Sequence, residues 1–464
     1  MTNQLFTTAA IPMTKDAFFY NYKESVKVVE HHIFLESGRG GIQSIAAWNP
    51  LAVIASTEQG IHIQWRDGRE EQRVGESLAL IEELTASYAI QTDEPYFSGG
   101  VIGSVSYDYS REIEKLSSRA QTDLRLPQHY FYLVDSWAVF HEEQQEMRFM
   151  KTTSSEVNLE QALTDFQHDH FTRNFHANKT ISHHMIEGMA VSMTGQQFEE
   201  AVVKIQQYIA QGDVFQVNLS VRQSKIYDEE PLLLYEALRT FNPSPYMAFI
   251  QSPDFAIVSG SPELLVKKKG MELSTRPIAG TRPRGRNDIE DQQLADELIK
   301  HPKERAEHVM LVDLERNDIG KVSRYGSVFV DEFMVIEKYS HVMHIVSNIR
   351  GEIAPYQNAT AVIRAMFPGG TITGAPKIRT MEIIEELEPV RRGIYTGSIG
   401  WIGYNGDLEM NIVIRTAFIQ DNKVHIQAGA GIVIDSVPQL EYTESLNKAK
   451  SMWQAVHMVE EMAK

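Results

Sequence analysis

The strongest constraint on the fold is a succession of three strand-like segments near the C-terminus, with no helix between them. These segments, at residues 393–404, 410–419 and 424–435, are rich in β-branched and aromatic residues. Segments of the same kind occur upstream, at residues 61–65, 101–109, 130–140, 212–220, 255–266 and 341–351. No internal repeat accompanies them. The pattern predicts an α+β fold with large, mostly antiparallel sheets.

Three helices are predicted between and after these strands. Thr194 and Gln197 have the spacing of a capping box ahead of an apolar helical stripe, which predicts a helix start at this point. A second helix is expected over residues 301–318. The last helix is predicted to run as one element from about Gln439 to Met462.

The polar, irregular stretch at residues 151–190 marks a boundary between two parts of the chain. With 464 residues, the chain is long enough for two lobes. We expect an N-terminal lobe at residues 1–155, a linker at 156–190 and a C-terminal region at 191–464. The stretch contains five histidines, for which a solvated segment is favoured over a metal site: His168, His170, His176, His183 and His184.

Composition excludes several classes of function. The net charge of −18 disfavours a nucleic-acid-binding protein, which is normally basic. The chain has no cysteine, so disulfides, thiolate metal sites and a cysteine nucleophile are excluded, in agreement with a reducing cytoplasm. No apolar run approaches the length of a membrane-spanning helix, and the N-terminus does not resemble a signal peptide. We therefore expect a cytoplasmic protein.

Two pairs of carboxylates have helical spacing. Glu304 and Glu307 share one face of a predicted helix, and Glu441 and Glu444 share a face of the last helix, which Lys448 continues one turn on. Carboxylates on two helices can hold Mg²⁺, which prefers oxygen ligands and keeps several waters. The alternative is two solvated helix faces, because such pairs are common on protein surfaces.

Two glycine-rich stretches lack the residues of nucleotide-binding motifs. Gly369 and Gly374 have the spacing of a P-loop, but Ala375 stands where the lysine would be. The stretch at 427–435 has Ile434 in place of the third glycine of a dinucleotide fingerprint. Its small residues are expected to let a strand approach a ligand closely.

Two charged or titratable residues lie in apolar strand segments. His344 is either a satisfied core histidine or a functional one. Arg415 needs a partner, and a bidentate carboxylate is the natural one. Together with the carboxylates and glycines, these residues indicate a site for a small polyanion, held by arginine, lysine, backbone N–H groups and Mg²⁺.

Eight stretches in a fixed order resemble the chorismate-utilising enzymes: GDVFQVNLS, GSPELLV, PIAGTRPRG, EHVMLVDLERND, YSHVMHIVS, FPGGTITGAPK, YTGSIGW and QAGAGIVIDSVP. The resemblance runs from about Thr194 to the C-terminus, with a weaker one in the N-terminal lobe through FLESGRGG at 34–41. It implies a two-lobed α/β sandwich whose large antiparallel sheets meet over a deep site. It also implies binding of chorismate, which carries two carboxylates, together with Mg²⁺.

The resemblance also implies roles for single residues. Glu263 would be the general acid that protonates the departing 4-hydroxyl, and His344 would assist proton movement at the far end of the ring. Mg²⁺ would be contacted by Glu307 and Glu444, with Glu304 and Glu441 close by or bonded through its waters. The substrate carboxylates would be held by Arg415, Tyr395 and Lys448. The remaining walls of the site would be formed by Gly280, Thr371, Gly429 and Gly431.

A few positions distinguish the branches of this family. Gln216 stands where the water-adding members have a lysine base, and glutamine cannot take a proton from water, so ammonia is the expected attacker. Ala279 resembles anthranilate synthases, in which ammonia is added and pyruvate is released. Asn218, Gly369 and Ser398, with Thr373, resemble aminodeoxychorismate synthases instead. We therefore expect formation of 4-amino-4-deoxychorismate for 4-aminobenzoate and folate synthesis, with anthranilate synthesis as the alternative.

Two further expectations concern partners. Because the chain contains no cysteine to hydrolyse glutamine, we expect ammonia from a glutamine amidotransferase subunit in a heterodimer. The family's tryptophan pocket is matched by FLES, which ends at Ser37, and by NPSPYM, which contributes Pro245, Tyr246 and Met247. This element is either a tryptophan pocket or packed aromatic core.

Overall fold

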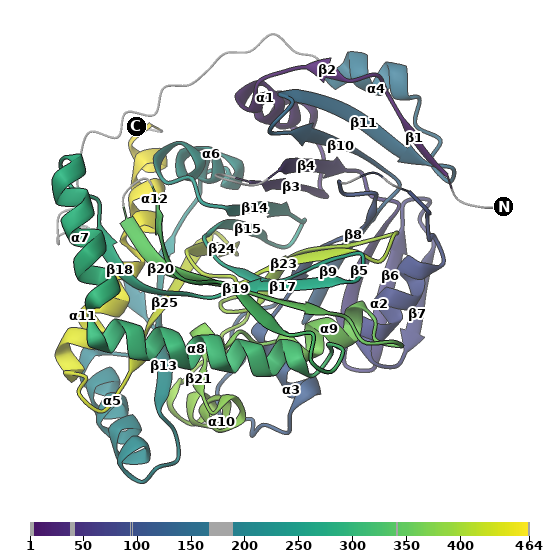
Figure 1. The fold of residues 1–464 in the computed structure, drawn as a ribbon. Helices are drawn as coiled ribbons and strands as arrows, with labels where there is room; N and C mark the ends of the chain where they lie inside the picture. The colour runs from purple at the N-terminus through teal and green to yellow at the C-terminus, as the bar shows by residue number, and fades with distance from the viewer. Residues whose placement is uncertain are drawn as a thin grey trace.

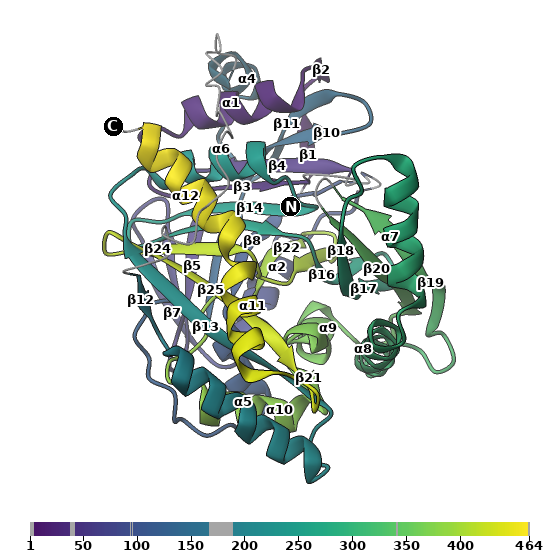
Figure 2. The same ribbon diagram turned by 90° about the vertical axis from the view of Figure 1, so that its left-hand side faces the viewer.

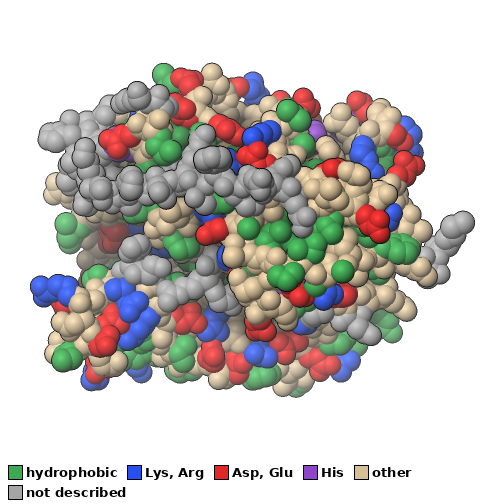
Figure 3. All heavy atoms as spheres, turned by 90° about the horizontal axis from the view of Figure 1, so that it is seen from above, with side chains coloured by type: hydrophobic (Ala, Val, Ile, Leu, Met, Phe, Trp, Pro, Cys, Tyr) green, Lys and Arg blue, Asp and Glu red, His purple; other side chains and the backbone are tan. Residues whose placement is uncertain are grey.

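The protein is described here by a computed structural model, which covers residues 4–37, 42–92, 94, 96–166, 189–339 and 342–462. The five histidines of the predicted linker lie outside these residues. Within them, no helix is long and apolar enough to cross a membrane. On the face shown in Figure 3, acidic and basic side chains are interspersed.

Two large antiparallel sheets form the centre of the molecule (Figure 1). The first sheet has the strand order β1 (Leu5–Thr7), β11 (Glu146–Thr152), β10 (Ser136–His141), β4 (Gln43–Trp48), β3 (His32–Glu36), β14 (Tyr246–Gln251), β15 (Ala256–Ser261), β24 (Thr416–Gln420), β25 (Lys423–Ile432), β13 (Gln216–Ile226) and β12 (Ala190–Val191). Two short strands, β2 (Ile11–Pro12) and β21 (Gly374–Ala375), pair with β11 and β13.

The second sheet faces the first across an apolar core. Its strand order is β18 (Ile278–Pro283), β20 (Val342–Glu352), β17 (Glu272–Arg276), β16 (Leu264–Lys269), β23 (Leu408–Asn411), β22 (Ser398–Gly403), β8 (Gly100–Val105), β9 (His129–Val134), β5 (Ala52–Thr57), β6 (Gly60–Trp65) and β7 (Glu70–Val74), with β19 (Phe329–Lys338) beside β20. All pairings between these strands are antiparallel. The predicted α+β class with large antiparallel sheets is confirmed.

Both sheets are shared by the N-terminal and C-terminal parts of the chain. In the first sheet β3 pairs with β14, which places Phe34 opposite Phe249. In the second sheet β8 pairs with β22, which places Ile102 opposite Trp401. The two parts therefore meet along continuous backbone hydrogen bonds in both layers.

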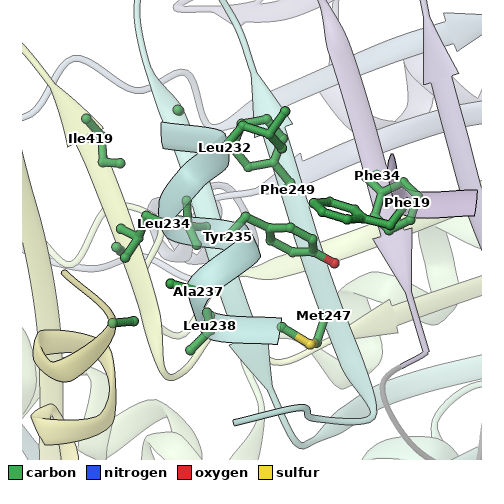
Figure 4. Packing of buried hydrophobic residues seen from close by; sticks show 14 of the residues in the cluster. Phe19, Phe34, Leu232, Leu234, Tyr235, Ala237, Leu238, Met247, Phe249 and Ile419 are labelled. Atoms are coloured by element: carbon green, nitrogen blue, oxygen red, sulfur yellow. The ribbon is translucent and has the colours of Figure 1, made fainter. Parts of the chain in front are cut away.

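Helices cover the outer faces of the sandwich (Figures 1 and 2). Those packed on the first sheet include α1 (Lys15–Ser25), α4 (Leu159–Phe166), α5 (Gly195–Ala210) and α6 (Pro231–Phe241). The second sheet is covered by α2 (Ser77–Ala86), α7 (Asp288–Lys300), α8 (Pro302–Gly320) and α9 (Ala359–Met366). Two more are α3 (Ser110–Ile113) and α10 (Lys377–Leu387). Figure 4 shows Tyr235 of α6 extending toward the rings of Phe19 and Phe34, beside Phe249.

Three segments that were predicted as single strands each form two strands in different sheets. Residues 130–140 divide at Asp135 into β9 and β10, residues 255–266 divide near Pro262 into β15 and β16, and residues 410–419 divide before Arg415 into β23 and β24. Both halves of each segment are buried, so the apolar run shows no break in hydrophobicity. These crossings carry the chain from one layer to the other.

Two other expectations need correction. Residues 159–166 of the predicted irregular stretch form α4, whose Phe166 stacks on Trp48 with a ring separation of 5.7 Å. The last helix is interrupted at Ala449, which separates α11 (Pro438–Lys448) from α12 (Lys450–Met462). The N–H group of Ala449 bonds to the carbonyl of Leu446, three residues back, so the helix tightens there. The capping box of Thr194 and Gln197 is confirmed.

Candidate active site

One cavity of about 380 Å³ lies where the two sheets meet α8 and α11. Its volume is within the range of small-molecule sites. Twelve of the predicted site residues line it: Gln216, Glu263, Gly280, Glu307, His344, Thr371, Tyr395, Arg415, Gly429, Gly431, Glu444 and Lys448. Residues from ten separate segments of the sequence therefore converge on one space.

Two of the predicted carboxylates do not line the cavity. Glu304 lies just behind its wall, where Oε1 accepts a hydrogen bond of 3.2 Å from Nη1 of Arg282. Glu441 lies on the first turn of α11, one turn before Glu444. Both residues are neighbours of the cavity rather than part of its surface.

Glu263 lies at a crossing between the sheets, directly before β16. Burial raises the pKa of its carboxyl group to about 7, against the opposing effects of the Thr371 hydroxyl, the Ile278 backbone amide and the charge of Arg415. Its Oε1 atom is buried and has no hydrogen-bond partner in the described part of the chain. The carboxyl group can therefore hold a proton near neutral pH and present it to a ligand.

Arg415 lies at another crossing, between β23 and β24, and not within a strand as predicted. Its φ of +52° turns the backbone, and its carbonyl accepts a hydrogen bond from the N–H group of Gly260. The guanidinium group faces the cavity, and the expected carboxylate partner is not found among the described residues. Burial lowers the pKa of Arg415, and the charge of Glu263 opposes this effect. A carboxylate of a ligand can take the place of the expected partner.

Gly280 and His344 form the opposite wall. Gly280 has a φ of +66°, a conformation that favours glycine, and a Cβ atom there would come within 2.9 Å of Oε2 of Glu304. The carbonyl of Gly280 accepts a hydrogen bond of 2.9 Å from Nδ1 of His344. Burial lowers the pKa of His344 to about 4, so the ring is neutral at pH 7 and its Nε2 atom carries no proton.

The carboxylates of Glu307 and Glu444 enter the cavity from α8 and α11. Glu307 accepts a 3.0 Å hydrogen bond from Nε2 of Gln216, and burial raises the pKa of Glu307. Glu444 pairs with Lys448 at 2.9 Å. No group of three or more histidine, aspartate or glutamate residues in the described ranges is arranged to hold a metal. These two oxygen donors fit Mg²⁺, which takes its remaining ligands from water or a bound anion.

The four arginines of residues 276–286, which include β18, are ion-paired with the protein itself. Arg282 pairs with Glu297 and Glu304, and Arg284 pairs with Asp291. Pairs are also formed by Arg276 with Glu332 and Glu337, and by Arg286 with Glu290. None of the four lines the cavity. These arginines therefore balance nearby acidic side chains and brace this part of the chain.

Residues 30–454 match the model of a family described as chorismate binding enzymes. This chain belongs to the chorismate-binding enzyme family. It is 49% identical to aminodeoxychorismate synthase component 1 of Bacillus subtilis strain 168, over 98% of this chain and 97% of that protein. It is 39% identical to anthranilate synthase component 1 of Acetivibrio thermocellus, over 91% of this chain and 89% of that protein.

Solved structures agree with this assignment. The crystal structure of anthranilate synthase component I from Streptococcus pneumoniae TIGR4 is similar with a TM-score of 0.79 and 34% identity, covering 89% of this chain and 92% of that chain. The menaquinone-specific isochorismate synthase from Escherichia coli has a TM-score of 0.73 at 17% identity, over 98% of this chain and 94% of that chain. The second likeness concerns the fold alone.

In this member of the family, the glycines of β25 make room for side chains of the neighbouring strand. A Cβ atom at Gly431 would collide with the amide of Gln216, and one at Gly429 would come within 2.6 Å of Oδ1 of Asn218. The close approach expected at this strand is therefore made by the side chains of β13, which themselves face the cavity.

Sequence reasoning missed the buried network beneath this wall. Arg392 and Glu388 form an ion pair of 2.8 Å in which both side chains are almost fully buried. Arg392 also donates to the carbonyls of Ile372 and Asn218, at 2.9 and 2.8 Å. Gln427 lines the cavity and was missed as well. The period of two along β25, which places Gln427 on the face of Gly429, was the available signal.

A second, smaller cavity of about 50 Å³ is lined by the four residues of the predicted tryptophan pocket, Ser37, Pro245, Tyr246 and Met247. Trp401 and Glu36 form other parts of its wall. Glu36 is held by Arg239, whose Nη2 lies 2.7 Å from Oε1. The cavity is therefore enclosed by side chains that are already paired or packed.

Proposed function

We propose that this protein converts chorismate and ammonia to 4-amino-4-deoxychorismate, the precursor of 4-aminobenzoate in folate synthesis. The identity of 49% to an aminodeoxychorismate synthase component 1, against 39% to an anthranilate synthase component 1, supports this branch. The observation that carries the chemistry is the buried carboxyl group of Glu263, whose pKa is raised to about 7 in the same cavity as the unpaired Arg415.

The residues of the cavity would divide the reaction between them. Arg415 and Lys448, with Tyr395, bind the two carboxylates of chorismate and orient the ring. Glu263 donates its proton to the 4-hydroxyl, which leaves as water. The lone pair of ammonia forms the new C–N bond, and the carboxylate of Glu263 takes up the proton that the new ammonium group releases. Chorismate and ammonia thereby give the amino product and one water.

Ala279 bears on how nitrogen reaches C4. Its methyl group can do neither covalent nor acid–base work, and no lysine of the described residues other than Lys448 lines the cavity. We propose direct attack by ammonia. The alternative is a covalent adduct between a lysine and the substrate. This adduct would be an amine, which borohydride cannot reduce, so the test is mass spectrometry of the quenched enzyme during turnover. A lysine carrying the substrate skeleton would exclude direct attack.

Mg²⁺ would be held by Glu307 and Glu444, with Glu304 and Glu441 as neighbours. When bound, the ion supplies positive charge that neutralises a substrate carboxylate. Chelation with EDTA is expected to abolish turnover, and addition of Mg²⁺ to restore it. Binding of Mn²⁺, followed by electron paramagnetic resonance, is expected to weaken in Glu307→Gln. Unchanged Mn²⁺ binding would exclude Glu307 as a ligand.

Ammonia would come from a glutamine amidotransferase partner in a heterodimer. The chain itself has no cysteine, and the relatives from Bacillus subtilis and Acetivibrio thermocellus carry the designation component 1. The isolated chain is expected to turn over with ammonium salts and not with glutamine. Turnover with glutamine by this chain alone would contradict the proposed partner.

Anthranilate synthesis is the second candidate, favoured by Ala279 and by the likeness to the Streptococcus pneumoniae structure. The deciding experiment incubates the chain with chorismate, Mg²⁺ and ammonium at alkaline pH and separates the products. A non-fluorescent amino product that a pyridoxal-phosphate lyase converts to 4-aminobenzoate supports our proposal. Fluorescent anthranilate with pyruvate would establish the second candidate.

The small second cavity is predicted to be either a tryptophan site or a packed wall. Calorimetric titration of the isolated chain with tryptophan distinguishes them, with Met247→Trp as a variant that fills the cavity. Heat of binding in the wild type that disappears in the variant would support a tryptophan site. Absence of heat in both proteins would support a packed wall.

A further inference from the structure

The cavity contains two carboxamide oxygens without a partner. Oε1 of Gln427 and Oδ1 of Asn218 are buried and accept no hydrogen bond from the described residues. The two residues are only 6% and 9% exposed, and both line the cavity. Buried polar atoms almost always have a partner. Two unpartnered acceptors in the wall of one cavity therefore point to a ligand that donates hydrogen bonds.

The two amides lie on the same face of neighbouring strands. The pairing of β13 with β25 places Asn218 opposite Gly431, Ser220 opposite Gly429 and Arg222 opposite Gln427. Alternate residues of a strand share a face, and directly opposite residues do so as well. Because Gly429 has no side chain, the amide of Asn218 can lie close to β25, where a Cβ atom at Gly429 would come within 2.6 Å of Oδ1 of Asn218.

The orientation of Gln427 is fixed by its neighbours. Ser220 donates its only hydroxyl proton to Oε1 of Glu388, at 2.7 Å, because Glu388 is ion-paired with Arg392 and can only accept. Ser220 must therefore accept from the amide nitrogen of Gln427, at 2.8 Å. The oxygen of Gln427 is the end that remains without a partner.

The amide of Asn218 is free at both ends. Neither its oxygen nor its nitrogen bonds to another residue in the part of the chain that the structure describes. A half-turn of the amide exchanges the two ends without loss of a hydrogen bond, so the oxygen can be presented to the cavity. The neighbouring carboxamide of Gln216 is not available in this way, because it donates to Glu307.

The chemistry of the reactants identifies the donor. Chorismate presents two carboxylates and an ether oxygen, all acceptors, and its single hydroxyl is the group that Glu263 protonates. Ammonia has three N–H donors and one lone pair, so acceptors that hold its N–H groups leave the lone pair free to attack.

We propose that Gln427 and Asn218 form the ammonia subsite of the cavity. The inference rests on the proposed use of ammonia as a co-substrate. Both residues bind the nucleophile through neutral oxygens, and the chain Arg392–Glu388–Ser220 holds Gln427 in the orientation that this requires.

The test uses Gln427→Met and Asn218→Leu, which keep the size of each side chain and remove its oxygen. The KM for free ammonia is expected to rise about tenfold in each variant, as for the loss of one hydrogen bond. The Kd of chorismate, measured by calorimetry without ammonia, is expected to change less than about twofold. A Kd that rises as much as the KM, or an unchanged KM for ammonia, would overturn the proposal.

Gln223→Met is the matched control. Gln223 is a buried carboxamide of the same strand, but it accepts a 2.6 Å hydrogen bond from the indole of Trp453 and does not line the cavity. This variant is expected to lower the melting temperature and to leave the KM for ammonia unchanged. A raised KM in the control would show that loss of any buried amide has this effect, and would overturn the assignment.

The product of the wild-type chain separates this proposal from the proposed function. If anthranilate forms, the proposed function fails, but the ammonia subsite is tested in the same way because that reaction also consumes ammonia. If the wild type adds water to chorismate and no nitrogen, both proposals fail.

Discussion

At the scale of single residues, the site depends on groups whose ordinary partners are absent. Glu263 is a buried carboxyl group with a raised pKa, and Arg415 is a buried guanidinium group that faces the cavity and forms no ion pair with the residues that the structure describes. His344 is neutral, because burial lowers its pKa to about 4. Each of these states costs free energy in the ligand-free protein, which is the usual condition of groups that act on a ligand.

Substitution Glu263→Gln is expected to lower kcat by about 10²- to 10⁴-fold, the usual contribution of a general acid. In the wild type, the rate at a fixed concentration of free ammonia is expected to fall as pH rises above about 7, because Glu263 then loses its proton. Initial rates over a pH series measure both effects. A wild-type rate independent of pH between 6 and 9 would contradict the role of Glu263.

The same substitution is expected to stabilise the fold at pH 8. The pKa of Glu263 is raised from 4.5 to about 7, so the folded state binds the proton more tightly than the unfolded state. The stability that this proton provides is present below pH 4.5 and is lost as pH rises to 7. Glutamine needs no proton, so Glu263→Gln should gain up to about 3 kcal/mol at pH 8.

Urea titrations of both proteins at pH 5 and pH 8 measure this difference. The gain is expected to be larger at pH 8 than at pH 5. An equal effect at the two pH values would show that the carboxyl group is not the source.

At the scale of helices and strands, the sequence predicts which segments are strands but not where the chain changes sheet. Residues 130–140, 255–266 and 410–419 are mostly apolar because both halves of each are buried, although in different layers. Asp135, Glu263 and Arg415 are the charged residues of these segments, and each lies at or beside a crossing. The resemblance to the family therefore located the cavity residues, and the alternation along β25 could have added Gln427, whereas the Arg392–Glu388 pair depends on tertiary contacts.

At this scale we predict that the substitution Arg392→Met destabilises the fold. The substitution leaves Glu388 buried without its partner and removes the support of the carbonyls of Ile372 and Asn218. The free energy of unfolding is expected to fall by about 3–5 kcal/mol, as for a buried ion pair that loses one partner. Combination with Glu388→Gln is expected to restore part of the loss, and urea titration measures both variants. A loss below about 1 kcal/mol would contradict this account.

At the scale of the whole molecule, both sheets join the N-terminal part of the chain to the C-terminal part. The pairings of β3 with β14 and of β8 with β22 place the boundary inside two hydrogen-bonded layers. Residues that line the large cavity come from the C-terminal region, whereas the small second cavity uses both parts. The C-terminal region therefore holds only part of each sheet, and the N-terminal part of the chain supplies the rest.

We therefore expect the whole chain to unfold in a single cooperative transition. Differential scanning calorimetry is expected to give one peak, because separation of the two parts would expose strand edges and apolar core in both layers. As a control, residues 191–464 expressed alone are expected not to form a stable fold. Two well-separated peaks, or a stable isolated C-terminal fragment, would contradict this expectation.

The crossings between the sheets have a consequence for how the enzyme can move. Glu263 and Arg415 lie on two of the short links that connect the layers. A hinge motion that separates the layers would therefore move these two residues away from each other. An outward movement of the layers is therefore not expected to accompany the binding of small molecules, and the positions of Glu263 and Arg415 relative to each other are expected to stay fixed.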